Sequence, residues 1–193
     1  FDNFIARESI RFLEKHGKRQ PWLMVASFLK PHDPFMPAER FAKQFRAEDM
    51  KLPETWGKVD LNRVPKEIRN SIQRHAATPE LGDPEQARRR IAFYYANLMQ
   101  VDDCIGRVLK SLEQQGLADD TIVVYTSDHG EMLGEHGLWQ KFVFYEDSVR
   151  VPLTFRVPGV KPGACRNHVS LVDVFPTLTE LCGVPAPGGI DGR

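Results

Sequence analysis

The sequence contains few cysteines, and no two of them lie close enough to form a recognisable motif. They are Cys104, Cys165 and Cys182, with no C-x-x-C arrangement among them. An odd number of cysteines cannot all pair within one chain. The sequence therefore predicts free, buried thiols rather than a disulfide framework.

A net charge and long apolar runs are also lacking. Lys+Arg and Asp+Glu both number 26, so the formal net charge is zero. No global field then attracts nucleic acid or an anionic membrane surface. No apolar run approaches the length of a membrane span, and the opening residues Phe1-Asp2-Asn3 resemble neither an initiator nor a signal peptide. We therefore expect no nucleic-acid partner and no membrane span, while the compartment stays unknown.

Helical and strand-like patterns alternate along the chain, which predicts an α/β fold with a mostly parallel sheet flanked by helices. Asp2 or Asn3 can cap a first helix that ends at Gly17. Apolar residues at steps of three and four from Ile91 to Leu112 predict the clearest helix. The remaining predicted elements are a buried strand at 22–29, strands at 121–127 and 151–157, and an Asp173-capped helix through Leu181.

The segment between the first strand and the long helix is rich in proline and charge. We expect residues 31–84 to form a long, partly ordered loop or insertion over the surface, a length typical of functional loops and also of flexible insertions. The basic run Arg88-Arg89-Arg90 stands near the start of the long helix. Because the net charge is zero, we interpret this run as a solvated helix face without a function.

One apolar, β-branched run ends in residues that can do chemistry. It extends from Thr121 to Ser127 and stops at Asp128-His129-Gly130. In open α/β sheets, ligands bind at the carboxyl ends of strands. A carboxylate beside an imidazole there suggests a divalent-metal site. Taken alone, the same three residues are also typical of an Asx turn.

Four further stretches occur in a characteristic order. They are K-P-H-D-P-F, then Y-Y-A-N-L-M-Q-V-D-D-C-I-G-R-V-L-K-S-L, then S-D-H-G-E-M-L-G-E-H-G-L-W-Q-K followed by V-P-L-T-F-R-V-P-G, and D-V-F-P-T-L-T-E-L-C-G-V-P. This series resembles the sulfatase family of the alkaline-phosphatase-like superfamily. Its Asp-His pair is similar to that of choline-sulfatase-like, iduronate-sulfatase-like and phosphonate monoester hydrolase-like members. The resemblance covers nearly the whole chain except Asp49 to Asp83, and it implies part of an alkaline-phosphatase-like sandwich.

The resemblance also implies roles for individual residues. Asp128 and His129 would be two of the divalent-metal ligands, Lys141 would contact the sulfate oxygens, and His32 would face the leaving group. Lys30 falls beside the site but matches no catalytic position of the family. His136 matches no metal ligand either, so we expect it to act as a turn residue or to support a ligand.

The chemistry of ester cleavage favours these residue types. Negative charge develops on the non-bridging and leaving oxygens, so a divalent cation and an ammonium can stabilise the transition state more than the ground state. The imidazole of His32 can protonate, or hydrogen-bond to, the departing oxygen. Oxygen-rich sites prefer hard ions, so calcium is the expected metal, with manganese and magnesium also compatible.

The chain departs from the family pattern in what it lacks. No C/S-x-P/A-x-R motif is present, and the family oxidises the first residue of that motif to formylglycine, the nucleophile. The paired-Asp segment that completes the metal site is also absent. We therefore expect residues 1–193 to be a single, incomplete domain: the later part of a sulfatase catalytic domain, without its N-terminal half and C-terminal subdomain. An interrupted sheet would expose an edge and favour association into a homo-oligomer.

Three hypotheses for function follow. The first is a fragment of a metal-dependent sulfuric ester hydrolase with a formylglycine nucleophile outside this chain, acting on a small-molecule or carbohydrate sulfate ester. The second is a phosphonate or phosphodiester hydrolase of the same superfamily. The third is a non-catalytic binding domain that keeps the fold. Loop residues such as Met36 to Arg63 would contribute to substrate specificity.

Overall fold

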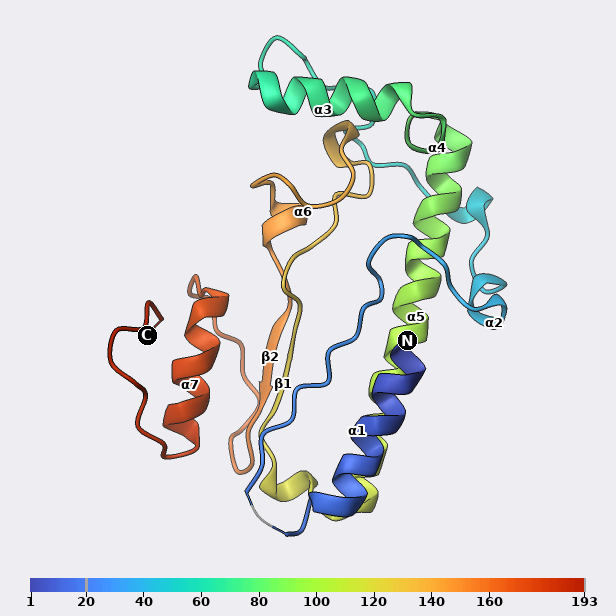
Figure 1. The fold of residues 1–193 in the computed structure, drawn as a ribbon. Coiled ribbons are helices and arrows are strands. Elements are labelled where there is room, and N and C mark those ends of the chain that lie inside the picture. Colours follow the sequence, from blue (N-terminus) through green and yellow to red (C-terminus); the bar gives the residue numbers. More distant parts are fainter. Residues whose placement is uncertain (20, 193) are drawn as a thin grey trace. The chain divides into compact units, whose positions relative to one another are not determined.

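The computed structural model describes residues 1–19 and 21–192, which divide into two compact units, 1–158 and 159–193 (Figure 1). The first unit holds every residue with a predicted role in chemistry. None of the helices among the described residues combines the length and apolar character needed to cross a membrane. The short elements of the first unit are α2 (Glu39–Ala42), η1 (Ala47–Asp49), α4 (Pro79–Gly82), η2 (Ala118–Asp120), η3 (Glu135–Gly137) and α6 (Glu146–Val149).

The central scaffold of the first unit is α5 (Pro84–Gln114). Its start is defined by Asp83, whose carboxylate accepts hydrogen bonds from the backbone N–H groups of Glu85 and Gln86 at 3.0 and 2.9 Å. Pro84 occupies the first helical position, where a missing N–H costs nothing. Gly116, at φ +68°, follows the end of the helix. The predicted long helix is thus confirmed, and it begins earlier than the apolar pattern indicated.

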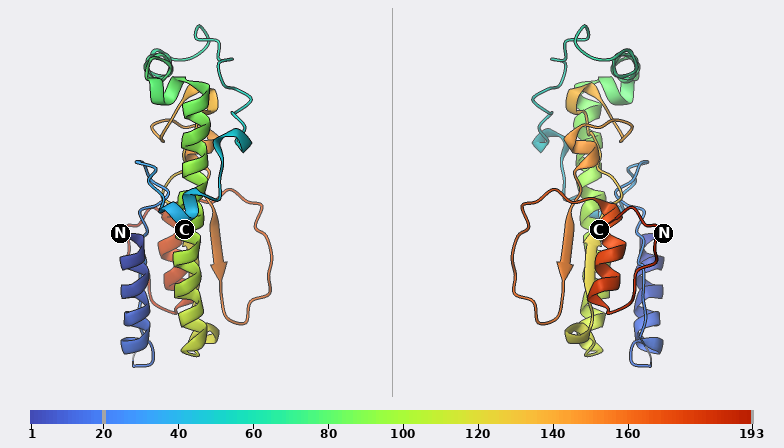
Figure 2. Two further views of the ribbon diagram at one scale, coloured as in Figure 1. Left: turned by 90° about the vertical axis from the view of Figure 1, so that its right-hand side faces the viewer. Right: turned by 90° about the vertical axis from the view of Figure 1, so that its left-hand side faces the viewer.

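Helix α1 (Asp2–His16) lies beside the second half of α5, as the views from two opposite sides show (Figure 2). Ala6 and Leu13 pack there against Cys104 and Val108. The expected capping role of Asp2 is not what the structure shows. Asp2 is buried, and its carboxylate accepts hydrogen bonds from the backbone N–H groups of Leu29 and Lys30 rather than from its own helix.

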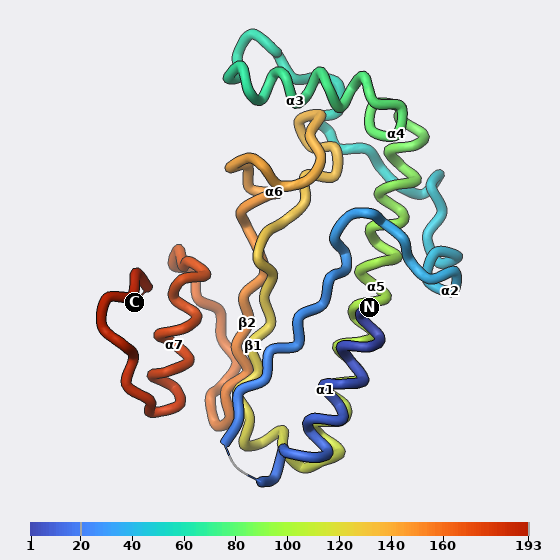
Figure 3. The backbone as a smooth tube through the Cα atoms, viewed as in Figure 1, coloured from blue at the N-terminus to red at the C-terminus, as the bar shows by residue number. Residues whose placement is uncertain are grey.

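Residues 22–29 are extended, but they do not form the predicted buried strand (Figure 3). Their side chains alternate as in a strand: Trp22, Met24 and Phe28 pack on the α1–α5 cluster. The opposite side is open, with Leu23 and Val25 79% and 81% exposed. The apolar sequence predicted the extended backbone correctly. It could not show whether another strand pairs with this backbone, and in the described part of the chain no strand does so.

The sheet of the described residues has two strands, β1 (Val123–Thr126) and β2 (Leu153–Arg156). They pair antiparallel, with Val123 opposite Arg156 and Thr126 opposite Leu153. The prediction of an α/β fold holds, whereas the mostly parallel sheet is not found in the described residues. Apolar periodicity indicates which residues form strands, but it carries no information about the direction of pairing.

Residues 31–84 are more ordered than the sequence suggested. They contain α3 (Lys66–Ala77), which lies across the start of α5 and is joined to it through α4 (Figure 1). Ile72 of α3 packs with Met132 and Leu138 of the segment that follows β1. This region therefore covers the residues that come after Asp128.

The second unit contains η4 (Leu171–Asp173) and α7 (Val174–Leu181). Asp173 precedes α7 as predicted, but its carboxylate belongs to a capping box of η4, where it accepts a hydrogen bond from the backbone N–H of Ser170 at 2.9 Å. All three cysteines are free, as predicted. Cys104 is buried, but Cys165 and Cys182 are exposed, which corrects the expectation of three buried thiols.

Candidate active site

Asp128 and His129 follow β1 after one intervening residue, where the chain leaves the sheet. Oδ2 of Asp128 lies 3.6 Å from Nε2 of His129, and the Asp128 side chain is 86% exposed. Nδ1 of His129 lies 2.7 Å from the carbonyl oxygen of Gly130. Because a carbonyl can only accept, we place the proton of a neutral imidazole on Nδ1, which leaves the lone pair of Nε2 facing the carboxylate.

This donor pair suits a divalent cation but does not complete a site. A carboxylate oxygen is a ligand for calcium or manganese, and an imidazole nitrogen with a free lone pair suits a transition metal. The hydrogen bond at Nδ1 is the kind that fixes a metal-binding histidine. Among the described residues, no group of three or more His, Cys, Asp or Glu side chains converges to hold a metal. Calcium takes about six to eight ligands, so the pair could supply only part of its coordination.

The segment after Gly130 forms a closed loop that returns Lys141 to the neighbourhood of Gly130. The N–H of Gly130 donates to the carbonyl of Ser148 at 2.7 Å, and the hydroxyl of Ser148 donates to the carbonyl of Lys141 at 2.7 Å. Inside the loop, the carboxylate of Glu131 accepts from the N–H of Gln140 at 2.6 Å. A Cβ on Gly130 would lie 2.0 Å from the carbonyl oxygen of Asp147, so only glycine fits this approach.

Lys141 meets His32 at the mouth of this loop. Nζ of Lys141 lies 2.8 Å from Nε2 of His32. Nδ1 of His32 is 2.6 Å from the carbonyl oxygen of Asp33, so the neutral ring carries its proton there and accepts at Nε2 from the ammonium. The rings of His32 and His129 lie 6.2 Å apart, centroid to centroid. The structure thus brings together all four residues that the sequence singled out: His32, Asp128, His129 and Lys141.

The loop that carries His32 is attached to α5 at several points. Nζ of Lys30 donates to Oδ1 of Asn97 at 2.9 Å and to the carbonyl of Met36 at 2.7 Å. Phe35 is buried against α5 in a cluster with Trp139. Lys30 therefore lies beside the site, as predicted, with its ammonium engaged in holding the loop.

Arg90 is a residue near the site that sequence reasoning missed. Its Nη2 donates to Oδ1 of Asp33 at 2.6 Å, and only 27% of its side chain is exposed. The interpretation of Arg88-Arg89-Arg90 as a solvated face is therefore wrong for Arg90. A signal was present: Arg90 stands three residues after buried Ala87 and four before half-buried Tyr94, which places it on the inward stripe of α5.

Two hollows are present in the first unit, and one of them adjoins Asp33 and Arg90. One, of about 310 Å³, is lined by residues that neighbour the candidate site. Burial, with a smaller contribution from the nearby charge of Arg74, lowers the pKa of His75 in its wall. The lining residues are Asp33, His75, Thr78, Glu80, Leu81, Arg90, Trp139 and Gln140.

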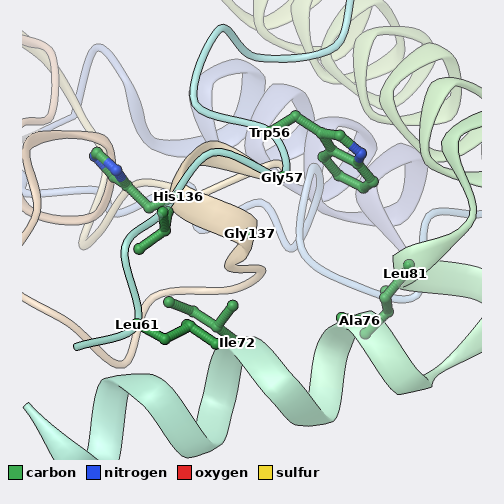
Figure 4. Close-up of a pocket in the computed structure, with 10 residues that line it drawn as sticks. Trp56, Gly57, Leu61, Ile72, Ala76, Leu81, His136 and Gly137 are labelled. Carbon is green, nitrogen blue, oxygen red and sulfur yellow. The ribbon is translucent and has the colours of Figure 1, made fainter. Parts of the chain in front are cut away.

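The other hollow is about 240 Å³ and more apolar (Figure 4). Figure 4 shows it above Ile72 and Ala76 of α3, with Trp56 and His136 on other sides. The ring of His136 stacks on Tyr145 at 4.5 Å, and its backbone N–H donates to the hydroxyl of Thr55 at 2.7 Å. These contacts are those of a turn residue.

Acid, imidazole and ammonium groups gather on the loops of an α/β fold, an arrangement whose ammonium suits an anionic ligand. The chain belongs to the sulfatase family, since the family model described as Sulfatase matches residues 1–184. It is 34% identical over 185 residues to a choline-sulfatase of Rhizobium meliloti, an alignment that covers 94% of this chain and 36% of that protein. It is 32% identical over 222 residues to the iduronate 2-sulfatase of Mus musculus, covering 96% of this chain and 40% of that protein.

Solved structures show the same relationship. The phosphonate monoester hydrolase of Silicibacter pomeroyi superposes with a TM-score of 0.85 at 28% identity, covering 98% of this chain and 40% of that chain. A protein solved in complex with its substrate D-glucosamine-2-N,6-O-disulfate gives a TM-score of 0.74 at 26% identity, covering 100% of this chain and 50% of that chain. The chain therefore has part of the alkaline-phosphatase-like fold, and it spans 36 to 40% of the length of the two curated relatives described above.

Proposed function

We propose that this chain supplies the sulfate-binding and leaving-group side of the active site of a metal-dependent sulfuric ester hydrolase. The observation that carries the proposal is the convergence of Lys141 and His32, 2.8 Å apart, beside the Asp128–His129 pair. Family membership over residues 1–184 supports the same reaction class.

Lys141 and His32 would act on the oxygens of the ester. The ammonium of Lys141 can donate a hydrogen bond to an anionic oxygen. Such a charge-assisted hydrogen bond is short and strong. A sulfate oxygen that enters between the two side chains would replace the hydrogen bond from Nζ to Nε2. His32, oriented by its bond to the Asp33 carbonyl, would take up a proton at Nε2 from solvent and pass it to the leaving oxygen as a general acid.

The reaction also needs a divalent cation and a nucleophile, which the four residues named above do not supply. A divalent cation, calcium by preference, with manganese or magnesium also suited, would neutralise charge on the ester oxygens when held by Asp128, His129 and ligands from elsewhere in the protein. We propose that the nucleophile is a formylglycine in a part of the protein outside this chain. Because Asp128 and His129 would hold the cation, their position would determine which sulfate oxygens face it.

A phosphonate or phosphodiester hydrolase is the second candidate, because the superposition at TM-score 0.85 is with a phosphonate monoester hydrolase. The same ammonium and imidazole can serve a tetrahedral phosphorus ester, since the charge that develops on its oxygens is similar. For the substrate, we propose a small-molecule or carbohydrate sulfate ester. The hollow beside Arg90 and Trp139 and the apolar hollow near Trp56 are the spaces where the rest of such a molecule could lie.

The test compares sulfate and phosphonate esters with the complete enzyme. We expect the complete enzyme to hydrolyse an aryl sulfate, and Lys141→Ala to lower kcat/KM by about 100-fold or more, the usual cost of removing one donor to a developing oxyanion. Lys43→Ala is a matched control, since Lys43 is exposed and pairs only with Glu39 one turn away. Faster turnover of an aryl phosphonate than of the sulfate would favour the second candidate, and turnover of neither would refute both.

A further inference from the structure

We infer that Arg90 is a positioning residue that holds His32 and Lys141 at their working separation. This inference rests on the proposed function, because it concerns how the side chains of that active site are held at the correct distance from each other. His32 and Lys141 are 109 residues apart in sequence, so no local turn can fix their distance. Arg90 lies on helix α5 and contacts one residue close to each of them in sequence, Asp33 and Trp139.

The first contact of Arg90 is with the loop that bears His32. Nη2 of Arg90 donates to Oδ1 of Asp33 at 2.6 Å, and the guanidinium lies over the ring of Phe35, 4.9 Å from its centroid. Asp33 is also the residue whose carbonyl orients the imidazole of His32. The ion pair therefore holds the same residue that sets the direction of Nε2.

The second contact is with the segment that bears Lys141. The guanidinium of Arg90 lies 5.2 Å from the ring centroid of Trp139, which is only 4% exposed. Trp139 is itself fixed, because its Nε1 donates to the carbonyl of Leu81 at 3.2 Å. Lys141 follows two residues later, so a shift of Trp139 would carry Lys141 with it.

These contacts call for arginine rather than for any cation. A planar guanidinium can bond to a carboxylate at its edge while its faces rest on aromatic rings, and it stays charged. The Arg90–Asp33 pair is about 70% buried on each side, so loss of either partner leaves a poorly solvated charge. Lysine at this position would keep the charge without the planar faces, and methionine would keep most of the volume without the charge.

The experiment measures how much kcat falls when Arg90 is replaced, for one ester with a poor leaving group and one with a good leaving group. His32 acts on the departing oxygen, so a misplaced His32 matters most when that oxygen is a poor leaving group. In the complete enzyme, we expect Arg90→Met to lower kcat for phenyl sulfate by on the order of 100-fold, the scale of a misplaced catalytic group. For 4-nitrophenyl sulfate, whose anion departs readily, the loss should be clearly smaller.

Three variants complete the design. Arg90→Lys should recover part of the loss, because the charge still pairs with Asp33. Asp33→Asn removes the same ion pair from the other side and should reproduce the leaving-group dependence, even if Arg90→Met folds poorly. Arg89→Met is the matched control, since Arg89 is exposed on the same helix and lies over the ring of Phe93.

Two outcomes would overturn the inference: equal losses for the two sulfates, or equal rates for Arg90→Met and Arg90→Lys, which would indicate packing alone. A failure of the proposed function looks different. His32→Ala would then show no leaving-group dependence, which would remove the role of His32 and this inference with it.

Discussion

The ammonium nitrogen of Lys141 lies 2.8 Å from Nε2 of His32, and this contact joins the two segments that bear the candidate catalytic groups. A cation held against a neutral imidazole by one hydrogen bond is a pair that an anion can separate. We propose that an entering ester oxygen replaces this bond: the ammonium then gains a charge-assisted partner, and Nε2 gains one once it has taken up a proton. The pair is thus arranged for an anionic ligand before one arrives.

The carboxylate of Asp128 gives a prediction about metal dependence. In the complete enzyme, chelation should abolish hydrolysis and added calcium or manganese should restore it. Asp128→Asn keeps an oxygen ligand but removes its charge. The metal concentration needed for half-maximal activity should therefore rise by at least about tenfold, since even residues that only support ligands cost about 10–100-fold. Titration of activity with metal measures this. Asp119→Asn, at an exposed position, should change nothing, and an unchanged metal requirement in Asp128→Asn would exclude Asp128 as a ligand.

The 193-residue chain alone should neither bind metal tightly nor turn over substrate. It offers two converging metal-binding side chains and no formylglycine motif, and two ligands hold a hard divalent ion poorly. Calorimetry should show weak calcium or manganese binding, and an aryl sulfate should remain intact. A tight, stoichiometric metal site or steady turnover by rigorously purified chain would contradict this.

Burial lowers the pKa of His75 below its ordinary value of 6.5. As pH falls below about 6.5, the unfolded chain takes up a proton at this position while the folded chain does not. The free energy of unfolding should therefore decrease as the solution is acidified below that value. His75→Gln should make the dependence shallower in the same pH range, as measured by denaturant unfolding at a series of pH values. His168→Gln, on an exposed histidine, is the control. Equal slopes for the His75 variant and the parent would disprove the assignment.

Two glycines should respond in opposite directions to alanine. At Gly130 the added Cβ would lie 2.0 Å from the carbonyl of Asp147, so the loop that returns Lys141 must shift. Gly130→Ala should lower both stability and activity. At Gly106, within α5, a Cβ meets nothing within 4 Å, and Gly106→Ala should stabilise the chain by roughly 0.5–1 kcal/mol. Thermal unfolding and kinetics on both variants test this, and a fully active Gly130→Ala enzyme would show that the loop position is not critical.

The candidate site residues could be named from the sequence, but the contacts that support them could not. Asp128 and His129 stand after a strand at a glycine turn, and the resemblance to the sulfatase family implied Lys141 and His32. The structure brings all four together. Arg90 was missed because a run of three arginines suggests solvent, and only its helical phase relative to Ala87 shows that it faces inward.

The errors in the fold have one physical origin. A strand is specified by its own side chains, but its pairing depends on residues elsewhere. Residues 22–29 adopt the extended backbone that their composition favours, without a ladder partner among the described residues. Asp2 shows the same limit on a smaller scale: its carboxylate binds N–H groups of Leu29 and Lys30, which are distant in sequence.

Helix α5 holds the His32 loop at two places, through Arg90 to Asp33 and through Asn97 to Lys30. These two residues are about two turns apart, so they project from the same side of the helix. One residue inserted between them would rotate Asn97 by about 100° relative to Arg90, and the loop could then keep only one attachment. The number of residues between Arg90 and Asn97 therefore decides whether the His32 loop keeps both of its attachments to α5.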